Sequence, residues 1–132
     1  MLINLITMPV YTLQQGESRK VELVVLSDDN QSPVDLTLAT KVHVLLYVGV
    51  EKVAQYSDLG ESGYGICEKD ATVTNKVNVF LERSQTQLYP VGPLSAIVLV
   101  EFDDPDFIEG KTDEYKVIVG TVRIGVGKDD VI

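Results

Sequence analysis

The chain has 132 residues, of which 45% are hydrophobic and 23% charged, proportions typical of one folded globular domain. Eleven lysines and arginines against 20 acidic residues give a net charge of −9, which disfavours binding to nucleic-acid phosphates. A single cysteine and a single histidine exclude an intrachain disulfide and the usual four-ligand zinc site built from this chain alone. Composition therefore predicts a small acidic scaffold or binding domain that carries no cofactor and has no DNA or RNA partner.

The first ten residues are apolar but lack the basic leading region and small-residue cleavage site of a signal peptide. Residues 1–9 are expected either to add a strand to this domain or to reach into a neighbour as an arm, the internal strand being favoured. Apolar runs such as 96–100 have the length of a strand and fall far short of the roughly 20 residues of a membrane helix. We therefore expect folding in a cytoplasm, without a membrane partner, and a C-terminal tail over 125–132.

Short β-branched segments separated by Gly, Pro, Asp and Asn run through the whole chain, a pattern typical of a sandwich or barrel of short strands. The expected strands cover residues 10–13, 19–26, 34–37, 41–48, 52–56, 76–82, 94–102 and 115–124. Alternation in two of these strands places Val42, Val44 and Leu46 on one face of the first, and Val77, Val79 and Leu81 on one face of the second. The strand over 41–48 is expected to be central in its sheet.

The residues between the expected strands predict two loops and one helical turn. Residues 57–65 contain three glycines and are expected to be a flexible loop, and residues 103–113 form an acidic loop. The one helical turn is expected between Ser84, as its capping residue, and Tyr89, directly before Pro90. Together these segments predict a single all-β domain over residues 1–132, with about seven to eight antiparallel strands and one short helical turn.

The acidic loop is the best metal candidate in the sequence, because calcium binds several carboxylate oxygens. Its candidate ligands are Asp103, Asp104, Asp106 and Glu109. Their spacing does not fit the EF-hand loop, which needs acidic residues at alternate positions, a glycine at the sixth and a glutamate at the twelfth. A solvated hairpin loop is therefore the favoured interpretation.

Catalytic patterns are weak throughout the chain. His43 lies in an apolar strand and Cys67 lies far from it in sequence, so nothing indicates a nucleophile pair. A nucleophile elbow of the G-x-S-x-G type is missing, and the glycines at 120, 125 and 127 precede no helix that could hold a phosphate. A glycosidase would need two acids across a cleft, usually lined with aromatic residues, and the chain has no tryptophan. We expect a protein that is not an enzyme.

The order of segments resembles the immunoglobulin-like domains of tailed-phage structural proteins, such as the N-terminal domain of phage baseplate upper proteins. The residues that carry the resemblance are a Gly-to-apolar strand over 16–26, Pro33, Asp35-Leu36-Thr37, Leu81, Thr86, Leu88-Tyr89, Gly92 and the strand over 94–100. The resemblance covers about residues 12–124 and implies an immunoglobulin-like β-sandwich, with a short helical crossover between the sheets. A baseplate protein normally continues into a long extension, which this chain lacks, so a capsid auxiliary protein is the favoured member of this class.

The resemblance thus implies a non-enzymatic virion protein, assembled in the host cytoplasm and bound in many copies to the capsid surface. Its partners would be the major capsid protein or other virion proteins. A tail or baseplate adaptor and a cellular carbohydrate- or ligand-binding sandwich are the alternatives. Because termini and loops carry the contacts of small sandwiches, the interaction candidates are Leu2, Ile3, Leu5, Ile6, Tyr64, Phe107, Val131 and Ile132.

Overall fold

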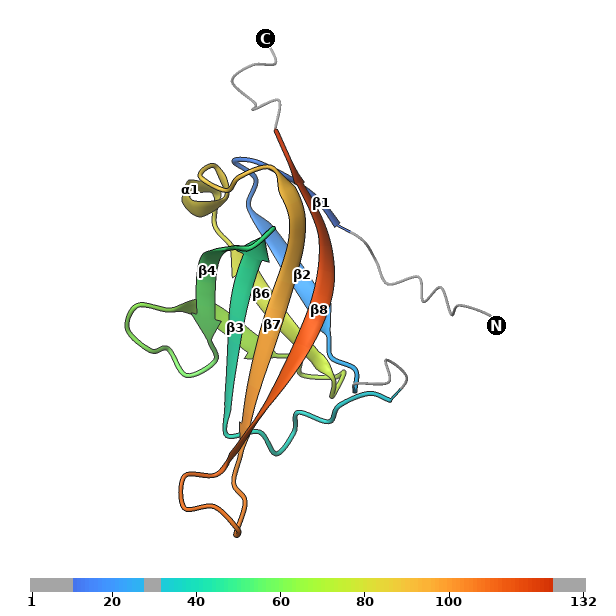
Figure 1. The fold of residues 1–132 in the computed structure, drawn as a ribbon, viewed down its shortest axis with the longest axis vertical. Helices are drawn as coiled ribbons and strands as arrows, with labels where there is room; N and C mark the ends of the chain where they lie inside the picture. Colours follow the sequence, from blue (N-terminus) through green and yellow to red (C-terminus); the bar gives the residue numbers. More distant parts are fainter. Residues whose placement is uncertain (1–10, 28–31, 125–132) are drawn as a thin grey trace, which may run out of the picture.

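The computed structural model describes residues 11–27 and 32–124, which form eight strands and one short helix (Figure 1). The strands are β1 (Tyr11–Gln14), β2 (Arg19–Val24), β3 (Lys41–Val48), β4 (Glu51–Ser57), β5 (Gly65–Lys69), β6 (Lys76–Leu81), β7 (Gly92–Phe102) and β8 (Lys111–Arg123). The helix α1 (Arg83–Thr86) connects β6 to β7. The expected all-β, sandwich-like fold of seven to eight strands with one helical turn is confirmed.

The strands form one sheet in the order β1-β8-β7-β3-β4-β5-β6-β2, which folds over on itself so that β2 lies close to β8 (Figure 1). The central position expected for residues 41–48 is confirmed, since β3 lies between β7 and β4. The prediction that all strands are antiparallel is wrong for two pairs: β1 pairs in parallel with β8, and β4 pairs in parallel with β5. The second parallel pairing spans only two residue pairs and joins the two layers of the fold.

The core lies between these two layers and is built from alternate residues of the strands. Side chains of β3 and β7 from one layer pack against those of β2 and β6 from the other. The residues expected to share a face in β3 and in β6 are all buried, at most 2% exposed: Val42, Val44, Leu46, Val77, Val79 and Leu81. The period-2 pattern therefore places these strands correctly, because one-sided burial fixes which face of each strand is apolar.

Several segments differ from the sequence prediction. Residues 34–36 are irregular instead of forming a strand, and a turn follows at Thr37 and Leu38; Asp35 Oδ1 accepts a hydrogen bond from the amide of Thr37 at 2.9 Å. Strand β5 was not expected, and β8 begins at Lys111 instead of Tyr115. Of the helices in the described residues, none is long and apolar enough to span a bilayer.

Helix α1 carries the chain from one layer to the other, as the resemblance implies. The expected capping residue Ser84 lies inside the helix, and the N-cap is Glu82 without a side-chain cap bond. Instead the amide of Arg83 donates to Ser18 Oγ at 3.1 Å. Buried Thr86 donates through Oγ1 to the carbonyl of Glu17 at 2.8 Å. The crossover is therefore held by the β1–β2 connection, a partner distant in sequence that no local pattern could reveal.

Asp70 organises the turn between β5 and β6. Its carboxylate accepts hydrogen bonds from the side-chain amide of Asn78 at 3.0 Å and from the main-chain amides of Thr72 and Val73 at 3.0 and 2.8 Å. The Asn78 bond, followed by the two amide bonds, holds the pKa of Asp70 well below its ordinary value of 3.8. The ionised form is therefore the one that the folded protein prefers.

This depressed pKa predicts a pH dependence of stability. A carboxyl group with a lower pKa in the folded state adds stability above its unfolded pKa, and that contribution is lost as the pH falls toward the folded pKa. The urea midpoint of the wild-type protein should therefore fall more steeply below pH 4 than that of Asp70→Asn, whose side chain does not titrate. The test is urea unfolding followed by circular dichroism from pH 2.5 to 7; parallel pH profiles would contradict the prediction.

Candidate functional site

The acidic loop joins β7 to β8 at one end of the molecule, and it is more ordered internally than a simple solvated loop. Asp104 Oδ1 accepts the amide of Asp106 at 2.9 Å, and the carbonyl of Asp104 accepts the amide of Phe107 at 3.0 Å. The amide of Gly110 then donates to the carbonyl of Phe107 at 3.2 Å. Gly110 has a φ of 78°, and a Cβ there would lie 2.5 Å from the carbonyl oxygen of Phe102, so glycine is required.

The calcium candidate does not form a coordination site in the described structure. Within residues 11–27 and 32–124, no three His, Cys, Asp or Glu side chains are grouped so that they could hold a metal ion. This includes Asp103, Asp104, Asp106 and Glu109, although all four belong to the same short loop. Asp104 accepts a hydrogen bond from the loop's own main chain through its carboxylate, and the other three residues are exposed.

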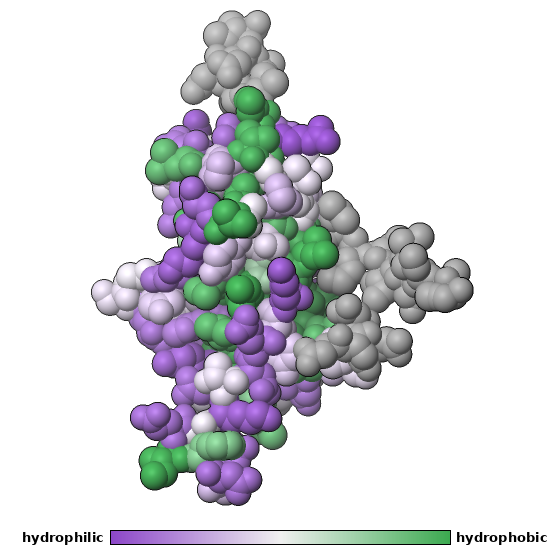
Figure 2. Space-filling model, in the orientation of Figure 1, coloured by the Kyte–Doolittle hydropathy of each residue, from purple (hydrophilic) through white to green (hydrophobic). Residues whose placement is uncertain are grey.

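The same loop presents apolar side chains to solvent at its tip. Phe107 is 56% exposed, and its neighbour Ile108, which the sequence analysis did not single out, is fully exposed. Figure 2 shows apolar atoms at this lower end of the molecule, directly beside strongly hydrophilic ones. An ordered loop that exposes two large apolar residues resembles the anchors of protein interfaces. The placement of Phe107 is thus compatible with its role as an interaction candidate.

Tyr64 is the second candidate that the structure describes, and it packs against its own fold. Its ring stacks on that of His43 in β3, with centroids 4.6 Å apart and an interplanar angle of 22°. His43 Nε2 lies 3.0 Å from Glu61 Oε1, and Lys41 Nζ lies 3.4 Å from the same oxygen. The hydrogen bond to His43, aided by its charge and by Lys41, lowers the pKa of Glu61. The glycine-rich loop expected to be flexible is therefore fastened to β3.

The opposite end of the molecule, beside α1, also exposes apolar residues. Val50 at the β3–β4 turn is 99% exposed, and Leu88 and Val91 after α1 are exposed as well. The turn is tied to the start of β7, because the amide of Gly49 donates to the carbonyl of Pro93 at 2.8 Å. Tyr89, not Leu88, closes this end of the core. Both ends of the molecule thus carry apolar side chains on main chain that is held in place.

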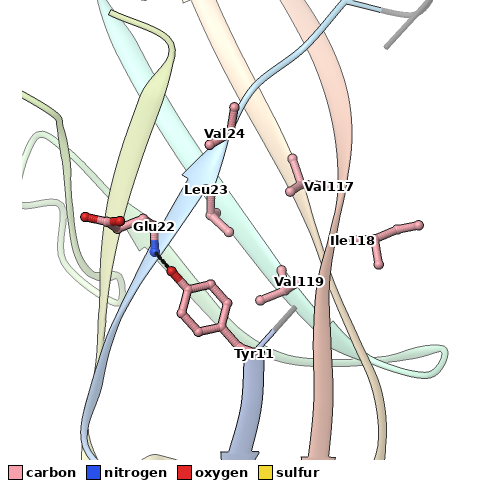
Figure 3. Close-up of a pocket in the computed structure, with 7 residues that line it drawn as sticks. All are labelled: Tyr11, Glu22, Leu23, Val24, Val117, Ile118 and Val119. Carbon is pink, nitrogen blue, oxygen red and sulfur yellow. Dashed lines mark hydrogen bonds between the residues drawn. The ribbon is translucent and has the colours of Figure 1, made fainter. Parts of the chain in front are cut away.

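A small hollow lies where the sheet almost closes, between β2 and the β1–β8 pair (Figure 3). The hydroxyl of Tyr11 crosses it and accepts a hydrogen bond from the amide of Glu22 at 3.2 Å. The remaining space is about 10 Å³, enough for roughly one water molecule. Its lining consists of Tyr11, Glu22, Leu23, Val24, Val117, Ile118 and Val119. The hollow is too small for a ligand, and it marks the place where β2 and β8 approach without pairing.

The buried polar and thiol groups serve the fold. Cys67 lies 3.8 Å from the carbonyl oxygen of Val42, and burial raises the pKa of its thiol to about 12, which keeps it protonated. The hydroxyls of Tyr56 and Tyr89 are 3.3 Å apart in the core, and burial followed by this contact raises the pKa of Tyr56. These buried hydroxyl and thiol groups therefore contribute contacts inside the core.

The terminal interaction candidates lie outside the described residues. These are Leu2, Ile3, Leu5 and Ile6 in the N-terminal segment, and Val131 and Ile132 in the C-terminal segment. Comparisons with protein-family models, curated proteins and solved structures find no match to this chain. The fold and the surfaces described above are therefore the basis for a proposal about function.

Proposed function

We propose that the protein is a non-enzymatic structural protein of a tailed-phage virion, a capsid auxiliary or decoration protein that binds the shell in many copies. The observation that carries the proposal is the presence of exposed apolar residues at both ends of a hydrogen-bonded β framework. The phage assignment itself rests on the order of segments that resembles immunoglobulin-like phage domains. A protein of this design acts as a rigid block whose ends bind neighbouring subunits.

The ends are suited to contacts because their apolar residues stand on an ordered main chain. Phe107 and Ile108 follow a turn fixed by Asp104, and Val50 lies in a turn that a hydrogen bond from Gly49 ties to Pro93. Little conformational entropy is then lost when these side chains become buried against a partner, which favours binding. Exposing such residues without a partner would leave apolar surface in water at a cost of about 25 cal/mol per Å².

Charge supports the same proposal. The net charge of −9 keeps individual copies apart in solution and disfavours attachment to anionic membranes or nucleic acids. At the lower end, the exposed acidic residues Asp103, Asp106 and Glu109 belong to the same loop as the two apolar residues. The complementary surface would be an apolar depression bordered by lysine or arginine side chains, which a capsid protein can offer once per subunit.

The proposal is tested by co-sedimentation of the full chain with purified empty capsids and, separately, with tail assemblies of the phage. Saturable, multi-copy binding to capsids is expected, equal in calcium and in chelator. The double variant Phe107→Ser, Ile108→Ser should bind at least ~10-fold more weakly, since anchor residues dominate interface energies. Circular dichroism should be unchanged, because both side chains are exposed.

Ile66→Ser is the matched control, since Ile66 is an exposed isoleucine, 66% accessible, on β5 away from both ends. Its capsid binding should equal that of the wild type. Binding to tails alone would replace the capsid role with that of a tail adaptor. Binding to neither assembly would overturn the virion proposal.

A further inference from the structure

The layer formed by β3, β7 and β8 has an apolar area at the centre of its outer face. Four outward side chains form this area, called the outer patch: Leu45 of β3, Ile97 and Leu99 of β7, and Ile118 of β8. Ile118 is 75% exposed, and the other three are partly exposed. Figure 2 shows apolar atoms across the middle of this face, which is turned toward the viewer. On the β3 side the patch ends at His43, whose ring is stacked with that of Tyr64.

The outer patch is unusual for a two-layer fold, because the outer face of such a sheet is commonly polar. Residues 96–100 of β7 are apolar without interruption, a pattern typical of strands that are buried on both faces. The outer face of the other layer follows the common pattern: β2 directs Lys20 and Glu22 outward, and Glu22 Oε2 lies 3.6 Å from Lys76 Nζ. Strand β7 thus has the composition of a strand covered on both sides, and the core of this chain covers one of them.

Two opposite charges border the outer patch on β8. Glu114 lies beside Leu99 and Lys116 beside Ile97 in the register of β7 with β8, so both charged side chains share the outer face. Both are exposed, and within residues 11–27 and 32–124 neither forms an ion pair or a side-chain hydrogen bond. A surface that has an apolar centre, one free carboxylate and one free ammonium group can pair with itself, because a twofold axis brings each charge against the opposite one.

We propose that the outer patch packs face to face against the same patch of a second copy of the chain, around a twofold axis that lies across the strands and passes over Val98. An axis across the strands reverses the strand direction, so Leu99 lies over Ile97 of the partner subunit. Glu114 then lies over Lys116 of the partner subunit, and Lys116 lies over the partner's Glu114. Two sheets packed face to face are about 10 Å apart, a gap that a glutamate and a lysine reaching toward each other can span.

Other twofold arrangements of the same face are less favourable. An axis over Leu99 places the two copies of Glu114 against each other. An axis over Ile97 does the same with Lys116, and like charges in contact destabilise an interface. An axis parallel to the strands, along β7, places Lys116 over Leu45 of the partner subunit, which buries an ammonium group without a partner. Of these arrangements, the proposed one combines apolar contact at the centre with two attractive charge pairs at the border.

Sedimentation velocity of the full chain over a range of concentrations tests the proposal. The salt concentration is about 0.15 M, at which the repulsion between two chains of net charge −9 is screened beyond about 8 Å. The wild type should form a dimer, and Ile97→Thr and Leu99→Thr should each raise the dimer dissociation constant about 10-fold or more. Both side chains lie on an internal strand, so this effect separates face-to-face packing from the pairing of strand edges. Ile66→Thr, at an exposed isoleucine of β5, is the matched control and should dimerise like the wild type.

An exchange of charges is the second arm of the test, and its variants keep the fold because Glu114 and Lys116 are exposed. Glu114→Lys and Lys116→Glu should each weaken the dimer about 10-fold or more, since each replaces two attractive pairs with two repulsive ones. The double variant Glu114→Lys, Lys116→Glu should restore wild-type dimerisation. Glu68→Lys, at an exposed residue of β5, is the control for net charge and should dimerise like the wild type.

A wild type that is monomeric at all concentrations would overturn the proposal, whichever other segment or protein covers the outer patch. A dimer that the substitutions of Ile97 and Leu99 leave unchanged would overturn it as well, because that dimer must form through another surface. The same holds for a dimer that the single charge substitutions do not weaken. Because no capsid is needed, this proposal and the virion role can fail separately.

Discussion

Tyr56→Ala is expected to lower the free energy of unfolding by about 3–5 kcal/mol, the range found for removing a buried aromatic ring. Tyr56 is 1% exposed and is the largest fully buried side chain in the core. Its ring lies so close to Gly65 that a Cβ there would be 2.6 Å away, so β4 and β5 meet around it. Its hydroxyl also contacts that of Tyr89, which follows α1. Removing the ring would therefore leave a cavity where the two layers join, as measured by urea unfolding.

Tyr56→Phe is the matched control, since it keeps the ring and removes only the hydroxyl. The loss of one buried hydrogen bond at 3.3 Å should cost about 1 kcal/mol. The difference between the two variants isolates the contribution of the ring. If alanine and phenylalanine were equally destabilising, the ring would not be the element that joins the layers.

Gly120→Ala should cost about 3 kcal/mol, at the upper end of the range for adding a methyl group to a tightly packed position. A Cβ at Gly120 would lie 1.9 Å from the carbonyl oxygen of Tyr11 and 2.8 Å from its nitrogen. Both are main-chain atoms, which cannot rotate aside as a flexible side chain could. Strand β1 would have to move away from β8, and hydrogen exchange at Gln15, whose amide donates to the carbonyl of Arg123 at 3.1 Å, should accelerate along with the loss of stability.

Gly63→Ala is the control substitution, at a glycine whose added Cβ would meet no neighbouring atom. Gly63 has a φ of 84° but nothing within 4 Å of the added Cβ, so only the backbone conformation resists the substitution. That cost is about 1–2 kcal/mol, and it should not affect exchange at Gln15. Equal destabilisation by the two alanines, with exchange at Gln15 unchanged in both, would show that the β1–β8 approach tolerates a side chain.

The parts of the fold that could be predicted from sequence are those with a local, one-sided apolar pattern. The strand over 41–48 was predicted with its observed bounds, because its alternating residues point into the core without interruption. Strand β5 was missed because only Cys67 of its residues is buried, while Ile66 points outward. The parallel pairings of β1 and β4 have no sequence signal, since they depend on which strands meet in space.

For the candidate surfaces as well, local features could be predicted from sequence, whereas contacts between distant segments could not. Exposure of Phe107 could be predicted from its place in an acidic loop, whereas the stacking of Tyr64 on His43 required knowing that residues 57–65 fold back onto β3. The four acidic residues of the calcium candidate belong to one short loop, but closeness along the chain does not group their carboxylates into a metal site.

The parallel pairing of β1 with β8 also constrains how the molecule is made. Tyr11 and Gly120 are partners although they stand more than a hundred residues apart, so the last contact of the sheet is also the one with the longest loop to close. During translation β8 leaves the ribosome after every other strand. Until then β1 has no partner strand, and β7, which pairs with β8 along its full length, has one open side. The nascent chain must pass through a stage that exposes apolar strand edges, and its strongly acidic composition is suited to suppress aggregation at that stage.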